Sequence, residues 1–288
     1  MSNFKSGFVA IVGRPNVGKS TLTNAFIGEK AAIVSNKPQT TRSNLAAIDN
    51  GENYQIVFVD TPGMHSPRTK LGEYMNSVAG SSLADVDVAI LVVEAGKEVY
   101  DLEKNIPLIL AINKADTVDK EVILPQIQAF TNESDFAAIV PVSAFKKDGI
   151  EELRKEILKH FDEGEPFYDT EIYADSTVRE MSAEIIREKI LRLLDREIPP
   201  GTAVEIEKMD ETGDVTKITA VIYCEKASHK PIIIGKKGEA IKRIGSYARK
   251  DIEKLLDTQV YLELWVKVRE DWRNKGTALK ELGFVKEK

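Results

Sequence analysis

Runs of consecutive apolar residues recur through the first half of the chain, and polar or glycine-containing segments follow each of them. The runs span residues 8–12, 88–93, 108–112 and 138–142. Helix-like segments lie between or after them, at 21–27, 72–83 and 150–161. Unbroken apolar runs of this length are typical of strands buried on both faces of a parallel sheet. We therefore predict an α/β domain, with a mostly parallel sheet flanked by helices, over residues 1–164.

Two more strands are predicted at residues 45–48 and 55–59, after a polar segment at 35–42 that reads as a loop. The residues between these strands are Asp-Asn-Gly-Glu, at 49–52. Because Asn-Gly is a favoured two-residue hairpin turn, we expect the chain to reverse at Asn50 and Gly51.

The second half of the chain has a different pattern. Six apolar residues at helical spacing predict a first helix: Met181, Ile185, Ile186, Ile190, Leu193 and Leu194. Strands follow at 204–207, 218–222 and 260–268, and a second amphipathic helix begins after Gly238. The stretch between Asp162 and Ser176 is acidic and contains Gly164 and Pro166. We expect its residues 165–176 to be a linker, which leaves 177–288 as a smaller α+β domain with a C-terminal tail.

The composition of the chain limits the kinds of binding site and the cellular compartment that we expect. Hydrophobic residues make up 42% of the 288 residues, and the formal net charge is −6, so any site for a polyanion must be local. The single cysteine, Cys224, excludes an intramolecular disulfide and is expected in the core. The sequence shows neither a signal peptide nor an apolar run long enough to span a bilayer, so we expect a cytoplasmic protein.

Residues 13–20 read Gly-Arg-Pro-Asn-Val-Gly-Lys-Ser, between a predicted strand and a predicted helix. This is the P-loop pattern in its required context, and its backbone N–H groups cradle phosphates at a helix N-terminus. The residues expected around the phosphates are Gly13, Asn16, Val17, Gly18, Lys19, Ser20 and Thr21. Lys19 adds a positive charge and Ser20 a hydroxyl ligand for Mg²⁺.

Three later motifs favour guanine as the base, and each follows a predicted strand. Asp60-Thr61-Pro62-Gly63 places a carboxylate near Mg²⁺ and a glycine N–H near the γ-phosphate. In Asn113-Lys114-Ala115-Asp116, the Asp116 carboxylate accepts from N1–H and the exocyclic amine of guanine, which adenine lacks. Asn113 is expected to tie this segment to the P-loop, Lys114 to lie along the base, and the backbone of Ser143 and Ala144 to contact O6.

The expected chemistry is Mg²⁺-dependent hydrolysis of GTP to GDP and phosphate. The metal ligands are expected among Ser20, Thr40, Thr41 and Asp60, with Thr41 preferred to Thr40 as the threonine that closes on the metal. Met64 stands where Ras-type enzymes carry a water-orienting glutamine, and His65 is an alternative that is more often solvated. Catalysis is therefore expected to rest on charge stabilisation by Lys19, Gly63 and Thr41, and we expect it to be slow. A scaffold unable to hydrolyse nucleotide is a further alternative.

Gly235-Lys236-Lys237-Gly238 precedes the second amphipathic helix, in the element order of a type II KH domain. A single G-x-x-G is weak, but here basic residues surround it. The expected RNA-binding residues are Lys230, Gly235, Lys236, Lys237, Gly238, Lys242 and Arg243. The alternative is a module that docks to a membrane or a protein without RNA.

Taken together, these motifs resemble the Era family of bacterial GTPases over nearly the whole chain. The resemblance implies binding near the 3′ end of 16S rRNA, a role in assembly of the 30S subunit, and peripheral association with the membrane. It also implies that Asn16 helps to bind K⁺, which would stimulate hydrolysis. We expect the protein to be a monomer. One departure is expected at 94–107, where members of the family carry a longer segment with a full helix.

Overall fold

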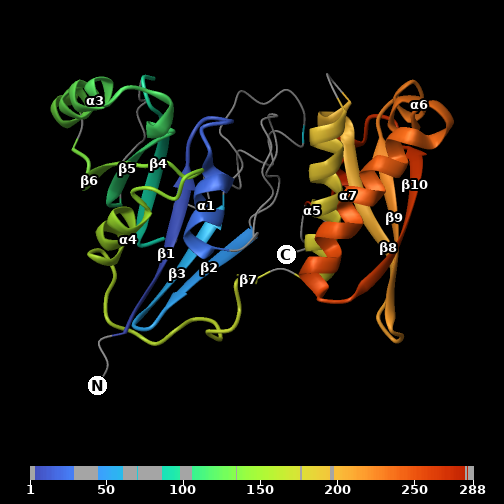
Figure 1. Cartoon of the computed structure of the whole chain (residues 1–288), viewed down its shortest axis with the longest axis horizontal. Helices are drawn as coiled ribbons and strands as arrows, with labels where there is room; N and C mark the ends of the chain where they lie inside the picture. The colour runs from blue at the N-terminus through green and yellow to red at the C-terminus, as the bar shows by residue number, and fades with distance from the viewer. Residues whose placement is uncertain are drawn as a thin grey trace. The chain divides into compact units, whose positions relative to one another are not determined.

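A computed structural model describes residues 4–28, 45–60, 70, 86–97, 106–133, 135–175, 177–194, 198–282 and 284 (Figure 1). For residues 45, 46, 60, 133, 174, 175 and 199 only the backbone is described. Apart from residue 70, which is grouped with the second unit, the described chain forms two compact units that divide between residues 175 and 176. Each unit is described by itself below.

The first unit is built on a seven-stranded sheet of described strands. Their bounds are β1 (Lys5–Val12), β2 (Leu45–Gly51), β3 (Tyr54–Asp60), β4 (Val88–Glu94), β5 (Leu108–Asn113), β6 (Ala138–Pro141) and β7 (Ala174–Asp175). The strand order is β6-β5-β4-β1-β3-β2-β7, and β2 runs antiparallel to both of its neighbours while the other pairs are parallel. The predicted mostly parallel sheet is therefore confirmed.

Helices cover both faces of this sheet (Figure 1). Their bounds are α1 (Lys19–Ile27), η1 (Ala115–Thr117), α3 (Lys120–Glu133) and α4 (Ile150–Leu158). Leu22 of α1 and Leu153 of α4 join one buried apolar cluster, whereas Phe130 of α3 joins a second cluster made from the alternate strand residues. The sequence did not predict α3, and the predicted helix at 72–83 lies outside the described residues.

The hairpin turn lies two residues further along the chain than predicted. Gly51 of β2 pairs with Tyr54 of β3, so the turn consists of Glu52 and Asn53. Asn50 and Gly51 are strand residues instead, and Asn50 Oδ1 accepts from Gln55 Nε2 at 2.8 Å. The prediction was wrong because side-chain contacts of the strand residues outweighed the local preference of Asn-Gly for a turn.

Residues of the predicted linker pack along the edge of the first unit. The buried Gln55 side chain accepts from the backbone N–H of Phe167 at 2.7 Å and of Tyr168 at 3.0 Å, and it donates to Tyr168 O at 2.9 Å. β7 then pairs with β2. This segment is therefore held by hydrogen bonds up to the start of the second unit.

The second unit has helices on one side of a three-stranded sheet (Figure 1). Its elements are α5 (Val178–Leu193), η2 (Pro199–Gly201), β8 (Thr202–Asp210), β9 (Val215–Cys224), α6 (His229–Ile234), η3 (Lys236–Gly238), α7 (Glu239–Leu256), β10 (Gln259–Val268), η4 (Trp272–Asn274) and α8 (Gly276–Glu281). The sheet order is β10-β9-β8, with β9 parallel to β10 and antiparallel to β8.

The core of the second unit lies between this sheet and the helices α5 and α7, which pack side by side. Ile186 of α5 and Ile244, Ala248 and Ile252 of α7 are fully buried, as the helical periodicity predicted. Cys224 is also fully buried. The α+β element order expected for a type II KH domain is confirmed.

Candidate functional site

The P-loop runs from the end of β1 to the first turn of α1. Lys19 is 7% exposed, and its Nζ donates to the carbonyl oxygens of Gly13 at 3.0 Å and Arg14 at 3.2 Å. Gly18 is the N-cap residue of α1 and has a φ of 101°. No side chain at this position forms a capping hydrogen bond to the N–H groups of the first turn. The N-terminal backbone N–H groups of α1 are thus suited to bind an anion.

Asn113, at the end of β5, connects this loop to two others. Its Nδ2 donates to Val17 O at 2.8 Å, and its Oδ1 accepts from the backbone N–H of Ala144 at 3.0 Å. The side chain is 2% exposed. It approaches the P-loop so closely that a Cβ on Gly18 would lie 2.2 Å from Nδ2. The predicted tie between these motifs is therefore a direct contact.

Asp116 and Ser143 come together although 27 residues separate them. Ser143 Oγ donates to Asp116 Oδ1 at 2.7 Å, and Lys146 Nζ lies 3.8 Å from Oδ2. The hydrogen bond from Ser143 is the main cause that lowers the pKa of Asp116 below its ordinary value. The carboxylate is thus held ionised, which is the form that accepts hydrogen bonds.

Lys114 has a partner that sequence reasoning missed. Its Nζ lies 3.2 Å from Glu94 Oε2, and Glu94 pairs in register with Asn113 across β4 and β5. Lys146 beside Asp116 was missed as well. Neither residue belongs to a motif, and each reaches the site only because the ends of neighbouring parallel strands meet at one edge.

The residues predicted to hold Mg²⁺ are only partly described. Ser20 lies in the first turn of α1, and Asp60 ends β3 in register with Ile11 of β1. Hydroxyl and carboxylate oxygens are the ligands Mg²⁺ prefers, so this donor set fits the metal. Thr40, Thr41, Gly63, Met64 and His65 lie outside the described residues. Within the described ranges, no group of three or more His, Cys, Asp or Glu side chains is placed to hold a metal.

In the second unit, the G-x-x-G segment forms a tight connection between α6 and α7. Gly235 has φ 77° and ψ 174°, and a Cβ there would lie 2.7 Å from the backbone nitrogen of Ala240. Lys237 also has a positive φ, of 53°. The loop thus brings backbone atoms to the surface, where a nucleic-acid backbone has close access.

Basic side chains surround this loop, as predicted. The exposed ones are Lys226, Lys230, Lys236, Lys237, Lys242 and Arg243. Two acidic residues of α7 form ion pairs with bases other than those around the glycine loop: Asp251 pairs with Lys189, and Glu253 pairs with Arg249. A positive surface therefore persists in an acidic chain.

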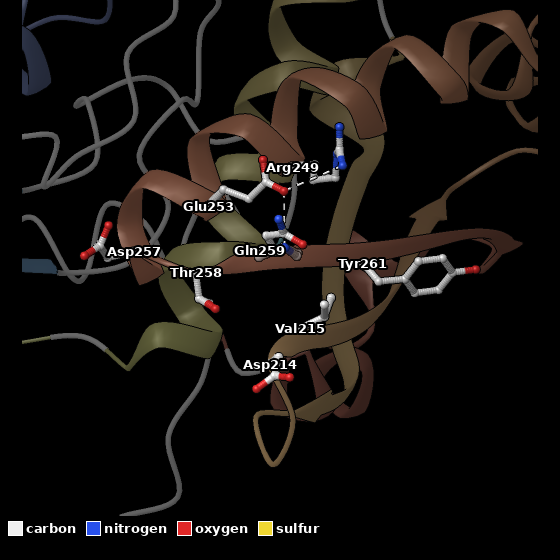
Figure 2. Close-up of a pocket in the computed structure, with 9 residues that line it drawn as sticks. Asp214, Val215, Arg249, Glu253, Asp257, Thr258, Gln259 and Tyr261 are labelled. Carbon is white, nitrogen blue, oxygen red and sulfur yellow. Dashed lines mark hydrogen bonds and ion pairs between the residues drawn. The ribbon is translucent and has the colours of Figure 1, made fainter.

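A hollow of about 1020 Å³ lies beside the C-terminal part of α7. Figure 2 shows the residues that line it. Asp214, Glu253 and Asp257 contribute carboxylates to its lining, beside Arg249. Glu253 Oε1 accepts from the backbone N–H of Val260 at 3.2 Å and lies 3.6 Å from Arg249. This acidic lining does not suit a polyanion.

Together the two units define a class: a P-loop GTPase joined to a C-terminal KH domain. A family model for the 50S ribosome-binding GTPases matches residues 8–115, and one for the KH domain matches residues 197–273. The chain is 47% identical to the GTPase Era of Ruminiclostridium cellulolyticum over 292 positions, with 98% of each chain covered. The GTPase Era of Clostridium acetobutylicum is 49% identical over 290 positions, again with 98% of each chain covered. The chain therefore belongs to the Era family of GTPases.

Two solved structures agree with this assignment. A crystal structure of an Aquifex aeolicus Era variant bound to GDP·AlF₄⁻ is 38% identical, with a TM-score of 0.93. A second, of Era with MgGDPNP and nucleotides 1506–1542 of 16S rRNA, is also 38% identical, with a TM-score of 0.94. Both comparisons cover 98% of this chain and 99% of the other.

The first two alignments extend over 292 and 290 positions, more than the 288 residues of this chain, so each relative carries residues that this chain lacks. The expectation that residues are missing from 94–107 stays a prediction. Among the helices that the structure describes, none combines the length and the apolar character needed to cross a bilayer.

Proposed function

We propose that this protein is a regulatory GTPase that binds GTP and GDP, hydrolyses GTP slowly, and binds 16S rRNA near its 3′ end through the KH domain. The observation that carries the proposal is the pair of hydrogen bonds made by Asn113, which join the P-loop and the Ala144 loop at the edge of the sheet. Family membership supports the same activity.

The phosphates are proposed to bind at the N-terminus of α1. There Lys19 and the backbone of Gly13, Asn16, Val17, Gly18 and Thr21 provide positive charge and N–H donors. Lys19 Nζ donates to two P-loop carbonyl oxygens, and as an ammonium group with three N–H donors it need not release both of them to reach a phosphate oxygen. Because those bonds hold the loop in shape, the site is preorganised.

The base is proposed to bind at the ends of β5 and β6. Asp116 accepts from guanine, Lys114 lies along the ring, and the backbone of Ser143 and Ala144 contacts O6. Ser143 already holds Asp116 ionised, and adenine, which lacks the two N–H donors of guanine, would leave the hydrogen bonds between this carboxylate and the base unmade. Ser20, Asp60 and either Thr40 or Thr41 would hold Mg²⁺, which neutralises charge on the phosphate oxygens.

Hydrolysis is proposed to depend on electrostatic stabilisation by Lys19, Asn16, Gly63 and Thr41, without a side chain that acts as general base. RNA is proposed to bind at Gly235 and Gly238 with Lys230, Lys236, Lys237, Lys242 and Arg243. The finer role is proposed on the resemblance to the family: assembly of the 30S subunit by a monomeric protein of the cytoplasm. The domain division near 165–176 is part of the same proposal.

One experiment tests the guanine site. Asp116→Asn replaces one hydrogen-bond acceptor by a donor, so the affinity for GTP should fall by at least about tenfold. The affinity for xanthosine triphosphate, whose base carries an oxygen in place of the exocyclic amine of guanine, should rise. Binding is measured by calorimetry for both nucleotides and for ATP. Equal binding of ATP and GTP by the unmodified chain would contradict the proposal.

A second experiment separates RNA binding from docking to a membrane or a protein. Lys236→Glu with Lys237→Glu should abolish binding to 16S rRNA nucleotides 1506–1542 and leave GTP hydrolysis in the absence of RNA unchanged. A matched pair, Lys120→Glu with Lys155→Glu on exposed helix positions of the first unit, controls for net charge. If both pairs bind RNA as the unmodified chain does, the docking alternative is favoured.

A further inference from the structure

Lys114 has a backbone conformation that residues other than glycine rarely adopt. Its φ is 61° and its ψ is 32°, directly before η1. Two hydrogen bonds to its carbonyl oxygen stabilise this conformation, from the backbone N–H of Thr117 at 2.9 Å and from Thr117 Oγ1 at 2.8 Å. Residues held in such conformations concentrate at binding and catalytic sites. The backbone of Lys114 is therefore fixed beside the base site.

The far end of the Lys114 side chain is held as well. Its Nζ lies 3.2 Å from Glu94 Oε2, and the two side chains are 35% and 36% exposed. An ion pair with this exposure contributes little to the free energy of unfolding, because water screens it. It does restrict the rotamers of a long and flexible side chain. The pair therefore fixes the direction of the lysine more than it stabilises the first unit.

Glu94 is a rigid support for this lysine. It is the last residue of β4, which lies beside β5 (Figure 1), and it pairs in register with Asn113. The next residue, Ala95, donates its N–H to Asn113 O at 2.8 Å. The chain then turns, and the N–H of Lys97 donates to Glu94 O at 3.0 Å. The backbone of Glu94 is thus fixed by the strand before it and by the turn after it.

Helix α3 binds the same turn from the other side. Gln126 Oε1 accepts from the backbone N–H of Gly96 at 3.0 Å, and Gln126 Nε2 donates to Lys97 O at 2.8 Å. Because α3 follows η1 in the chain, the segment that starts at Lys114 returns to the turn that follows Glu94. The acid and the lysine therefore belong to one closed ring of contacts.

We propose that Glu94 is a positioning residue of the guanine site: its carboxylate holds the Lys114 side chain extended, so that the carbon stem supports the base. A lysine that already has this direction loses less conformational freedom when the nucleotide binds. Glu94 acts through the lysine. Its effect is on affinity and not on kcat, because the base contacts are the same in the ground state and in the transition state. This inference rests on the proposed guanine site.

The test measures the affinity of the full chain for GTP and GDP by calorimetry, and kcat at saturating GTP. Glu94→Gln removes the charge and keeps the size, so both affinities should fall by about fivefold at low salt while kcat stays within about twofold. Because the ion pair is partly exposed, the difference from the unmodified chain should shrink as the salt rises from about 0.05 M to about 0.5 M. Glu94→Asp keeps the charge and should restore part of the affinity.

A double-variant cycle separates positioning from a direct contact with the nucleotide. Lys114→Met removes the ammonium group and keeps an apolar stem, so it should also weaken both nucleotides by about fivefold. In the Lys114→Met background, Glu94→Gln should have no further effect, because its effect passes through the ammonium group. A direct hydrogen bond from the nucleotide to Glu94 would instead give the same loss in both backgrounds.

Glu156→Gln is the matched control. Glu156 forms a partly exposed ion pair with Lys159 at 2.7 Å. The pair lies at the end of α4 beside Leu158, whose carbonyl oxygen accepts from Lys5 Nζ at the start of β1, whereas the P-loop follows the end of β1. Its affinities for GTP and GDP should equal those of the unmodified chain. The melting temperatures of all variants should stay within about 4 °C of the unmodified chain.

Each outcome decides between these accounts. If Glu94→Gln binds both nucleotides as the control does, the inference is overturned, and the guanine site stands as long as Asp116→Asn still weakens GTP binding. The inference is also overturned if Glu94→Gln weakens binding equally with and without the Lys114 ammonium group, because the acid would then contact the nucleotide itself. If Asp116→Asn binds GTP as tightly as the unmodified chain, the proposed guanine site itself fails.

Discussion

The Asn113 side chain donates a hydrogen bond to the Val17 carbonyl oxygen at 2.8 Å, across 96 residues of sequence. Its other amide atom accepts from Ala144, so the phosphate loop and the loop after β6 share one buried side chain. The geometry of the two ends of the nucleotide site is therefore coupled before any ligand binds. Binding energy is gained most effectively when such groups are already in place.

Asn113→Ala should lower affinity for GTP and GDP together, by about 10- to 100-fold, because it leaves two buried backbone groups unpaired. The same loss should reduce the free energy of unfolding of the first unit by about 1–3 kcal/mol. Calorimetric titration and urea unfolding measure the two effects. Affinity unchanged for both nucleotides would show that the tie is dispensable.

Ser143→Ala should raise the pKa of Asp116 toward its ordinary value, since the Ser143 hydroxyl is the main group that stabilises the carboxylate. A carboxyl whose folded pKa is lowered favours the folded state above its ordinary pKa, and that contribution is lost as the pH falls through the lowered value. Carboxyl NMR titration measures the shift. Ser143→Thr keeps the hydroxyl and should keep the low pKa, which separates the hydrogen bond from a packing effect.

Gly235→Ala and Gly238→Ala should differ although both glycines have positive φ. At Gly235 the added Cβ meets the backbone of Ala240, whereas at Gly238 nothing lies within 4 Å. The φ and ψ of Gly235 also fall in a region open almost only to glycine. Gly235→Ala should cost about 1–3 kcal/mol and weaken RNA binding more than tenfold, and Gly238→Ala about 1 kcal/mol. Thermal unfolding and RNA titration compare them, and equal effects would contradict the clash.

The sequence was sufficient to predict the motifs and their places in the fold. Each motif follows an apolar strand, and the ends of parallel strands gather at one edge, so Asn113, Asp116 and the P-loop were expected to meet. The KH order was predicted for a similar reason, because Ile244, Ala248 and Ile252 follow a clear helical period. The clear hydrophobic patterns of the strands and of the helix thus made both predictions possible: the places of the nucleotide motifs and the element order of the KH domain.

What the sequence could not predict depends on contacts between distant segments. The Asn50-Gly51 turn was wrong because Gln55 is fixed by Phe167 and Tyr168, more than a hundred residues away. Helix α3 was missed because it contains Pro125 and exposes Leu124, so its period is weak.

Glu94 and Lys146 reach the base site from segments outside the motifs. The conformational preferences of short segments do not predict contacts of this kind between distant parts of the chain. They become visible only when the strands are assembled into the sheet.

Arg154→Met should be among the most destabilising single changes in the first unit. Arg154 is 8% exposed, its Nε lies 2.8 Å from Asp49 Oδ2, and it also bonds to Phe26 O and to Glu151. Removing the guanidinium leaves the buried Asp49 without its partner, at about 3–5 kcal/mol. Urea unfolding measures the loss. Asp49→Leu with Arg154→Met should recover much of it, and a double variant as unstable as the single would contradict this account.

GTP hydrolysis should be faster in K⁺ than in Na⁺ at equal ionic strength, by on the order of tenfold or more, if Asn16 helps to place a monovalent cation where other GTPases use an arginine. Asn16 has φ 68° and an exposed side chain, so its amide is accessible beside the P-loop. Asn16→Ala would add backbone strain to the loss of the amide, whereas Asn16→Gly removes the amide and accepts the positive φ. Asn16→Gly should therefore hydrolyse GTP at one slow rate in both salts while its GTP affinity stays within about threefold. Single-turnover rates in KCl and NaCl measure the effect, and a cation preference that survives in Asn16→Gly would assign it to another group.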